Sequence, residues 1–242
     1  DPGVWGEGVN YSYQWLIDGV AIPRATNPSY QIQANDIGHQ ISVQVTGSKL
    51  GYESTSRTSS SVIGTPASFD RVQLPQITGS STYGSTLSVA VGNWGTGVTM
   101  GIQWLLDGND ISGATSSTYK IKLDDIGHMI SVRATGVKAG YQTTSTTSSS
   151  NQISKAKLSV GSLSVTGKAI VGQTLTAKVG PWINGATITY QWLLDGKAIR
   201  GATKPTYKLL PIHKGHKISV TVTQNAPGYL TSSKTSTGTK IG

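Results

Sequence analysis

Apolar and polar residues alternate with a period of two along most of this chain. In residues 117–123, "STYKIKL", Tyr119, Ile121 and Leu123 fall on one face and two lysines on the other. Residues 129–136, "MISVRATG", alternate in the same way. A period of two is typical of half-buried β-strands, and no stretch keeps a period of 3.6. The pattern predicts an all-β protein, with single helical turns at most around the sequence LDDIG.

Earlier strands are predicted at residues 72–78 and 86–92, and Pro75 marks the first as an edge strand because proline has no N–H for the ladder. The sequence "IQWLLDG" predicts a strand that ends in a two-residue hairpin turn. Asp107-Gly108 suits a type I′ turn, in which both central residues have positive φ.

This hairpin sequence occurs three times. Its tryptophans, Trp15, Trp104 and Trp192, lie 89 and 88 residues apart, and each is followed by a Tyr, a Gly-His and a Gly-Tyr at constant spacing. A repeat of this length suits an independently folding domain better than a solenoid unit. The sequence therefore predicts three domains, as beads on a string, at residues 1–64, 65–154 and 155–242.

Cysteine is absent from the 242 residues, so no disulfide staples these small domains and no thiolate serves as nucleophile or metal ligand. Each domain must bury an apolar core of its own. Because aromatic side chains dominate core energetics, we predict that the hairpin tryptophans form the structural core: Trp15, Trp104 and Trp192.

The order of landmarks resembles a known family. A Trp is followed by (Y/I)QWLxDG, an Ala-Thr, a Tyr, GHxISV, a Gly-Tyr and a Ser/Thr-rich strand. This order resembles the tandem immunoglobulin-like repeats of secreted and surface proteins from actinobacteria and related Gram-positive bacteria, over essentially the whole chain. The resemblance implies a β-sandwich of roughly seven to eight strands per copy, in proteins where such repeats follow catalytic domains or build stalks. It implies no particular ligand.

The first copy is shorter than the others. Trp94 and Trp182 follow about 30 residues of their own copies, whereas the equivalent Trp5 has only four residues before it. The first two strands of the first copy are therefore expected to be missing. Either the sequence is a fragment, or another chain donates the strands, since an incomplete sandwich exposes apolar faces and unpaired edges.

Charge separates the copies. Residues 155–242 hold twelve Lys and Arg and one acid, a net charge of +11, while residues 1–154 hold eight Lys and Arg and ten acids, a net charge of −2. A field of this size attracts polyanions such as wall teichoic acid, anionic lipid or nucleic acid, and a solubilising surface is the alternative. Specific nucleic-acid recognition is not expected, because lysine outnumbers arginine and no recognition helix is predicted. The candidate polyanion contacts are Lys197, Arg200, Lys204, Lys208, Lys214 and Lys217.

A second set of tryptophans lies in glycine-flanked loops: Trp5, Trp94 and Trp182. Such an indole serves either as an exposed platform for a carbohydrate or as a plug folded over the end of the sandwich. The presence of this tryptophan in all three copies, whose surfaces differ, favours the plug. Tyr52 and its equivalents in the Gly-Tyr pairs are predicted to anchor the start of the last strand.

We predict no catalytic residues. Asp124 and Asp125 are neighbours that point apart on an extended chain, unlike the opposed carboxylates of a glycosidase. The histidines of the GHxI turns are expected to hydrogen-bond to the backbone. His213 and His216 form an H-x-x-H, but zinc needs three or four ligands, so we predict neither a metal nor a cofactor.

These observations favour a non-catalytic spacer or adhesion module of a secreted or surface-attached bacterial protein, whose basic third copy contacts an anionic cell wall. One alternative is a carbohydrate-binding appendage of a secreted polysaccharide hydrolase. The other is a filament or assembly subunit that a strand-donating partner completes at the first copy. No transmembrane segment is predicted.

Overall fold

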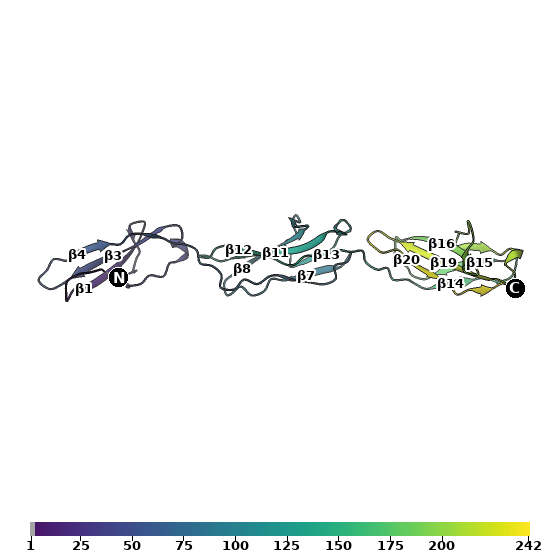
Figure 1. Cartoon of the computed structure of the whole chain (residues 1–242), viewed down its shortest axis with the longest axis horizontal. Coiled ribbons are helices and arrows are strands. Elements are labelled where there is room, and N and C mark those ends of the chain that lie inside the picture. Colours follow the sequence, from purple (N-terminus) through teal and green to yellow (C-terminus); the bar gives the residue numbers. More distant parts are fainter. Residues whose placement is uncertain (1–2) are drawn as a thin grey trace. The chain divides into compact units, whose positions relative to one another are not determined.

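The computed structural model describes residues 3–242, so Asp1 and Pro2, the start of the first predicted domain, lie outside the described residues. The described chain is all-β, with five antiparallel sheets and only single turns of 3-10 helix, as predicted (Figure 1). None of these turns is long and apolar enough to cross a membrane. We call the three sequence copies repeats 1, 2 and 3.

The chain divides into two compact units, and the division crosses repeat 2. One unit takes in the chain up to Gln76 with Val91–Ile102 and Arg133–Ser148. The other consists of Ile77–Ala90, Gln103–Val132 and Ser149–Gly242. The domain boundaries near residues 64 and 154 therefore stay a prediction.

Repeat 2 has eight strands, within the seven to eight that the family resemblance implied. They are β6 (Gln76–Thr78), β7 (Thr86–Ala90), β8 (Thr99–Leu106), β9 (Asn109–Asp110), β10 (Thr118–Lys120), β11 (Met129–Val137), β12 (Thr144–Thr147) and β13 (Asn151–Gln152), with the 3-10 turn η2 (Leu123–Asp125).

Two sheets contain these strands. The first has the order β12-β11-β8-β9 with β13 beside β11, and the second has the order β10-β7-β6. Strand β6 is an edge strand, as Pro75 predicted, but it begins after the proline rather than at residue 72. Tyr119 and Ile121 are buried as predicted, whereas Leu123 is 45% exposed. That prediction was wrong because the strand gives way to η2 and the alternation ends.

Repeat 3 has the same architecture. Its strands are β14 (Leu163–Thr166), β15 (Thr174–Val179), β16 (Thr187–Leu194), β17 (Lys197–Ala198), β18 (Thr206–Lys208), β19 (Lys217–Asn225), β20 (Ser232–Thr235) and β21 (Thr239–Lys240), with the 3-10 turn η3 (Pro211–His213).

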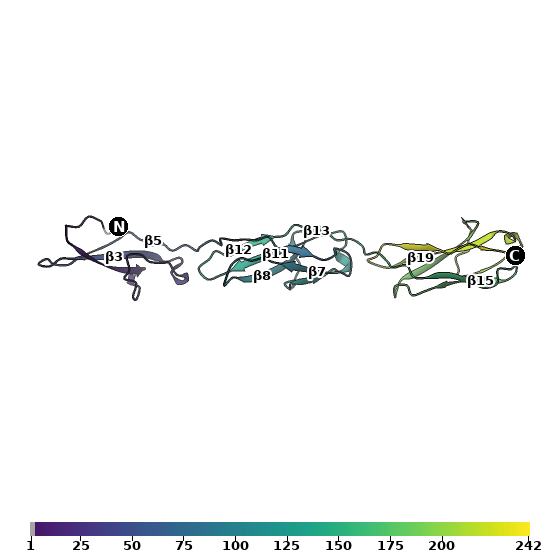
Figure 2. The ribbon, with the colours of Figure 1, turned by 90° about the horizontal axis from the view of Figure 1, so that it is seen from below.

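The five-stranded sheet of repeat 3 has the order β17-β16-β19-β20 with β21 beside β19, and the three-stranded sheet has the order β14-β15-β18. Figure 2 shows β15 and β19 in separate layers. Apolar side chains from both layers form one buried cluster, which includes Leu175 of β15, Val220 of β19 and the fully buried Trp192. Repeat 3 is thus an immunoglobulin-like sandwich with a tryptophan at its centre.

Repeat 1 has a single sheet among the described residues. Its elements are β1 (Asn10–Ile17), β2 (Val20–Ala21), β3 (Gln40–Ser48), β4 (Thr55–Thr58), β5 (Val62–Ile63) and η1 (Ala34–Asp36), and the sheet has the order β2-β1-β3-β4 with β5 beside β3.

The missing layer changes the core of repeat 1. Trp104 and Trp192 are fully buried, at 0% exposure, but Trp15 is only half-buried. Its indole stacks on Tyr30 at 5.6 Å. Trp104 and Trp192 are thus buried as the predicted core role requires, whereas Trp15 is less buried than predicted because no described strands cover its sheet face. Strand donation by another chain at this face stays a prediction.

The hairpin turns follow the prediction. Asp107 has φ 49° and Gly108 has φ 81°, so both central residues of the turn between β8 and β9 lie in the left-handed region. Asp18 and Asp195 occupy the same positions with φ of 47° and 46°. The Asp-Gly dipeptide sets these turns because glycine, and to a lesser degree aspartate, tolerates positive φ.

Candidate functional site

Each hairpin aspartate also holds a histidine. The Nδ1 atom of His128 lies 2.5 Å from Oδ2 of Asp107, and the backbone N–H of Met129 donates to Oδ1 of Asp107 at 2.8 Å. These hydrogen bonds lower the pKa of Asp107, and the bond from the Met129 N–H has a larger effect than the bond to His128. The same pair recurs as Asp18 with His39 and as Asp195 with His216, both at 2.6 Å.

The predicted backbone partner of these histidines is therefore wrong, since the partner is a carboxylate 21 residues earlier. A constant Asp-to-His spacing in all three copies was the signal that would have found it. The pair fastens the hairpin turn to the start of the following strand, and no nucleophilic side chain accompanies it in these hydrogen bonds. We regard it as a structural clamp.

A buried hydrogen-bond acceptor lies in the 3-10 turn of repeats 2 and 3, η2 and η3. In repeat 2 it is Asp125, whose Oδ2 accepts from the Tyr119 hydroxyl at 2.9 Å and from the backbone N–H of Lys122 at 2.7 Å. In repeat 3 His213 replaces it, with Nε2 3.2 Å from the Tyr207 hydroxyl. Burial and the pairing with Asp125 raise the pKa of Tyr119. These groups stabilise the turn and present no opposed carboxylates.

The described residues contain no group of three or more His, Cys, Asp or Glu placed to hold a metal ion. The Nδ1 atoms of His213 and His216 each make a hydrogen bond to a separate partner, so these two atoms do not serve together as metal ligands. Nδ1 of His213 accepts from the backbone N–H of Leu210, and Nδ1 of His216 bonds to Asp195.

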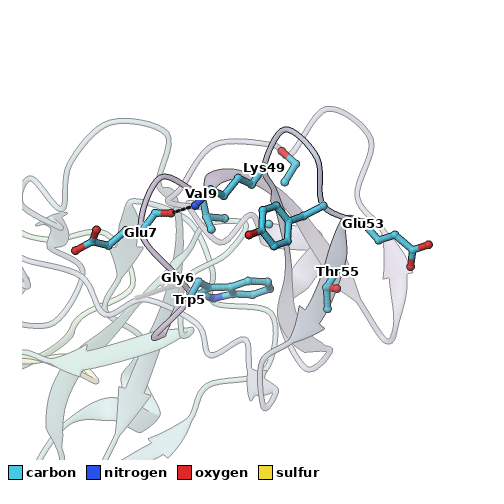
Figure 3. A pocket seen from close by; sticks show the side chains of 10 residues that line it. Trp5, Gly6, Glu7, Val9, Lys49, Glu53 and Thr55 are labelled. Atoms are coloured by element: carbon cyan, nitrogen blue, oxygen red, sulfur yellow. Dashed lines mark hydrogen bonds between the residues drawn. The ribbon is translucent and has the colours of Figure 1, made fainter.

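The loop tryptophan of repeat 1 lines a pocket of about 310 Å³, which we call the ring slot (Figure 3). Its other lining residues include Tyr52, Lys49, Glu7 and Glu53. Trp5 packs against Gly47 so closely that an added Cβ at this glycine would lie 2.6 Å from the indole. In Figure 3 the carboxylates of Glu7 and Glu53 point outward on opposite sides of the slot. The slot thus combines aromatic surface with polar groups at its rim.

Repeat 2 shows what fills the same place. The backbone N–H of Ala67 donates to the carbonyl of Gly140, and two residues later the Phe69 ring stacks on Tyr141 at 5.2 Å. The same ring meets Trp94 edge-on at 5.8 Å. In repeat 2 a six-membered ring therefore packs on the two aromatic residues whose equivalents line the slot of repeat 1. A hollow of about 270 Å³ remains beside this ring.

The loop tryptophans differ accordingly. Trp94 is 4% exposed and packs on Gly136, so in repeat 2 its indole is not available as an exposed platform. Trp5 and Trp182 are half-buried. Tyr52 is 73% exposed, so the predicted anchor role is wrong for Tyr52, because no aromatic ring among the described residues of repeat 1 stacks on it as Phe69 stacks on Tyr141. The Arg57 guanidinium lies over the Trp5 ring at 5.4 Å.

All six candidate polyanion contacts of repeat 3 are exposed. Three of them gather at one end of the sandwich: Lys197 on β17, Lys214 after η3 and Lys217 at the start of β19. Arg200 and Lys204 lie in the loop after β17, and Lys208 on β18 pairs with Thr174 in the other sheet. The structure thus divides the candidates into two groups.

Lys240, which the sequence did not single out, joins the first group. It is the cross-strand partner of Lys217 on β21. The turn that carries Lys214 is held beside this strand by a bond from the N–H of Gly215 to the carbonyl of Ile241, at 2.8 Å. We call the set Lys197, Lys214, Lys217 and Lys240 the lysine-rich end.

Repeat 2 has no basic residue at the equivalent positions, which are Asn109, Ile126, Met129 and Gln152. Like charges opposite each other on neighbouring strands destabilise a sheet, so the pairing of Lys217 with Lys240 carries a cost that an anionic partner would relieve. The acid of repeat 3 at this end, Asp195, is already bonded to His216 and to the N–H of Lys217.

No protein-family model matches this chain, and no curated protein matches its sequence. Solved structures resemble it weakly. A Ca²⁺-stabilized adhesin with which an Antarctic bacterium binds ice is 11% identical with a TM-score of 0.35. The match covers 96% of this chain and 65% of the adhesin. The insect immune protein hemolin is 13% identical with a TM-score of 0.24, covering 97% of this chain and 69% of hemolin.

A Bacteroides ovatus protein from a mixed-linkage glucan utilization locus, solved with a heptasaccharide, is 17% identical with a TM-score of 0.19, covering 94% of this chain and 60% of that one. Similarities of this size carry no argument about function, which therefore depends on the sites described above.

Proposed function

We propose that this chain is a non-catalytic, immunoglobulin-like adhesion region of a secreted or surface-attached bacterial protein, and that the lysine-rich end of repeat 3 contacts an anionic surface such as the cell wall. The observation that supports this proposal most is the concentration of four exposed lysines at one end of the domain, at positions where repeat 2 has no basic residue. Lysines act as diffuse point charges, which suits a polymer with many phosphates better than a single defined ligand.

The non-catalytic assignment is supported by the acids in the turns. The carboxylates of Asp107 and Asp125 both accept structural hydrogen bonds, and each stabilises a turn. Neither is placed opposite a second acid across a cleft, as hydrolysis of a glycoside requires.

The test is co-sedimentation of the whole chain with Gram-positive cell walls, and with walls stripped of teichoic acid, across a salt titration. The variant replaces the four lysines of the lysine-rich end with glutamine. The control makes the same change in net charge elsewhere on repeat 3: Lys155, Lys157, Lys178 and Lys234 to glutamine.

We expect the unmodified chain to bind intact walls, and the binding to weaken as salt shortens the screening length from about 10 Å at 0.1 M to about 3 Å at 1 M. At about 1 kcal/mol per lysine near an anionic surface, the variant should bind at least tenfold more weakly. The control should bind more weakly than the unmodified chain but more tightly than the variant. Equal losses in the two quadruple variants would show that total charge, not the lysine-rich end, drives binding.

A second candidate is carbohydrate binding at the ring slot of repeat 1. The observation in its favour is that Phe69 fills this place in repeat 2, so the open slot has the size and stacking surface for one ring. A pyranose ring has the same apolar faces and adds hydroxyl groups, and the polar residues Glu7, Lys49 and Glu53 lie at the rim of the slot. The volume of the ring slot, about 310 Å³, lies at the lower limit of ligand pockets, which run from about 300 to 1,000 Å³.

The experiment is affinity electrophoresis of the whole chain in gels that contain soluble glucans. Tyr52→Ala removes one wall of the slot from an exposed position, and Tyr141→Ala is the matched change in repeat 2, where the Phe69 ring already stacks on the tyrosine. Loss of one stacking surface should weaken binding by roughly tenfold. Unchanged mobility of all three proteins in every glucan would reject the sugar site.

A further inference from the structure

At the lysine-rich end, repeat 3 differs from repeat 2 in a second way. Ile212 of η3 is 71% exposed and the preceding Leu210 is 48% exposed. The equivalent residues of repeat 2 are Asp124 and Lys122, both polar. Large exposed aliphatic side chains on a folded domain that lie together indicate an interaction surface.

The two side chains border an apolar groove. A hollow of about 500 Å³ lies between the β16–β17 hairpin and η3, and its lining includes Leu194, Ile199 and Tyr207 as well as Leu210 and Ile212. Lys197 of the lysine-rich end also lines this groove. Apolar surface and positive charge therefore meet at one place.

The tip that carries Ile212 is held in shape. The backbone N–H of Leu210 donates to Nδ1 of the buried His213 at 2.9 Å, and the N–H of Lys214 donates to the carbonyl of Pro211 at 3.2 Å. The N–H of Gly215 fastens the turn to the C-terminal strand. With its backbone bonded in this way, the tip presents Ile212 to solvent and does not fold it back into the core.

We propose that the lysine-rich end of repeat 3 docks on an anionic lipid bilayer, with Ile212 and Leu210 entering the interface and the four lysines contacting the headgroups. The proposal rests on the proposed function, in which this end holds an anionic surface, and it names that surface. Charge complementarity and apolar side chains together select a lipid. A hydrophilic polyanion satisfies the lysines but leaves the aliphatic side chains in water.

Stable membrane attachment needs two signals, because a single apolar anchor or a polybasic patch alone binds weakly. The lysine-rich end supplies the electrostatic signal, and the pair Leu210 and Ile212 supplies the apolar one. Removing either signal should therefore release the chain from vesicles.

The experiment is flotation of the whole chain with vesicles of equimolar phosphatidylcholine and phosphatidylglycerol, and with pure phosphatidylcholine. The variant Leu210→Lys with Ile212→Asp installs the residues of repeat 2 and leaves the net charge unchanged. We expect binding to the anionic vesicles only, at least tenfold weaker in the variant. The same variant should bind teichoic-acid-bearing walls within about twofold of the unmodified chain, because its lysine-rich end is intact.

A second readout does not depend on affinity. The chain has no cysteine, so Ile212→Cys carries an environment-sensitive fluorophore at one site, and Asp124→Cys is the matched label in repeat 2. Anionic vesicles should shift the emission of the first label to the blue and leave the second unchanged.

Vesicle binding by the double variant as tight as that of the unmodified chain, or equal emission of the two labels, would overturn the proposal. Binding to walls without binding to vesicles would overturn it too, while the proposed function stands. Binding to neither surface would reject both.

Discussion

The histidine that replaces a buried aspartate makes repeat 3 sensitive to acid. His213 is 3% exposed, and its Nδ1 must accept the N–H of Leu210. The groups around it are the Tyr207 hydroxyl, His216 with its partner Asp195, and Lys197 across the groove. Protonation would place a hydrogen on Nδ1 that faces the hydrogen of Leu210. Burial chiefly, and the charge of His216, lower the pKa of His213.

The sign of the effect follows from linkage. A histidine with a folded pKa below its unfolded value of about 6.5 binds more protons when the chain unfolds, so acid favours unfolding. The free energy of unfolding of repeat 3 should fall by up to about 1.4 kcal/mol per pH unit as the pH drops below about 6.5, until the folded pKa is reached. The loss at pH 5 is at most about 2 kcal/mol.

Hydrogen exchange of the whole chain, corrected for the intrinsic rate, measures this difference between β19 in repeat 3 and β11 in repeat 2. The variant His213→Asp installs the acceptor that Asp125 provides in repeat 2, which bonds to the tyrosine hydroxyl and to a backbone N–H. We expect β19 of the unmodified chain to lose protection between pH 7 and pH 5 by more than β11, and the variant to remove the excess. An equal loss in both strands, or an excess that survives in the variant, would refute the reasoning.

Three further predictions concern the core and the turns. Trp104→Ala should cost roughly 3–5 kcal/mol of unfolding free energy, and Trp15→Ala distinctly less because its indole is half-buried, as denaturant titration of each variant would show. Asp107→Asn, which tolerates the positive φ of this position, should lower the stability of repeat 2 near neutral pH. It should not do so below the folded pKa of Asp107, because a carboxylate with a lowered pKa stabilises only while ionised; melting curves across acid pH test this. Gly136→Ala should cost roughly 1–3 kcal/mol and raise the exposure of the indole to a fluorescence quencher, because its Cβ would lie 2.6 Å from Trp94.

Much of the fold was predictable because it depends on local sequence. The two-residue period identified the strands, and Asp107-Gly108 identified a hairpin turn with both φ values positive. The end of the strand after Lys120 was not predictable from the period. Leu123 continues the alternation in sequence, but η2 turns it toward solvent.

The candidate sites divide in the same way. The sequence identified Lys197, Lys214 and Lys217 by charge, but it had no reason to choose them over Arg200 or Lys208. Strand pairing makes that choice, because β21 places Lys240 opposite Lys217 while Lys208 belongs to the other sheet.

By itself the sequence determined the three copies, the all-β class and the burial of Trp104 and Trp192, because these follow from the spacing of residues along each copy. Tertiary structure alone decided which equivalent residues become different sites. Trp94 packs against Phe69 while Trp5 lines an open slot, and Ile212 is 71% exposed and borders a groove. The physical reason is that exposure depends on what packs against a side chain, and those neighbours come from segments distant in the chain.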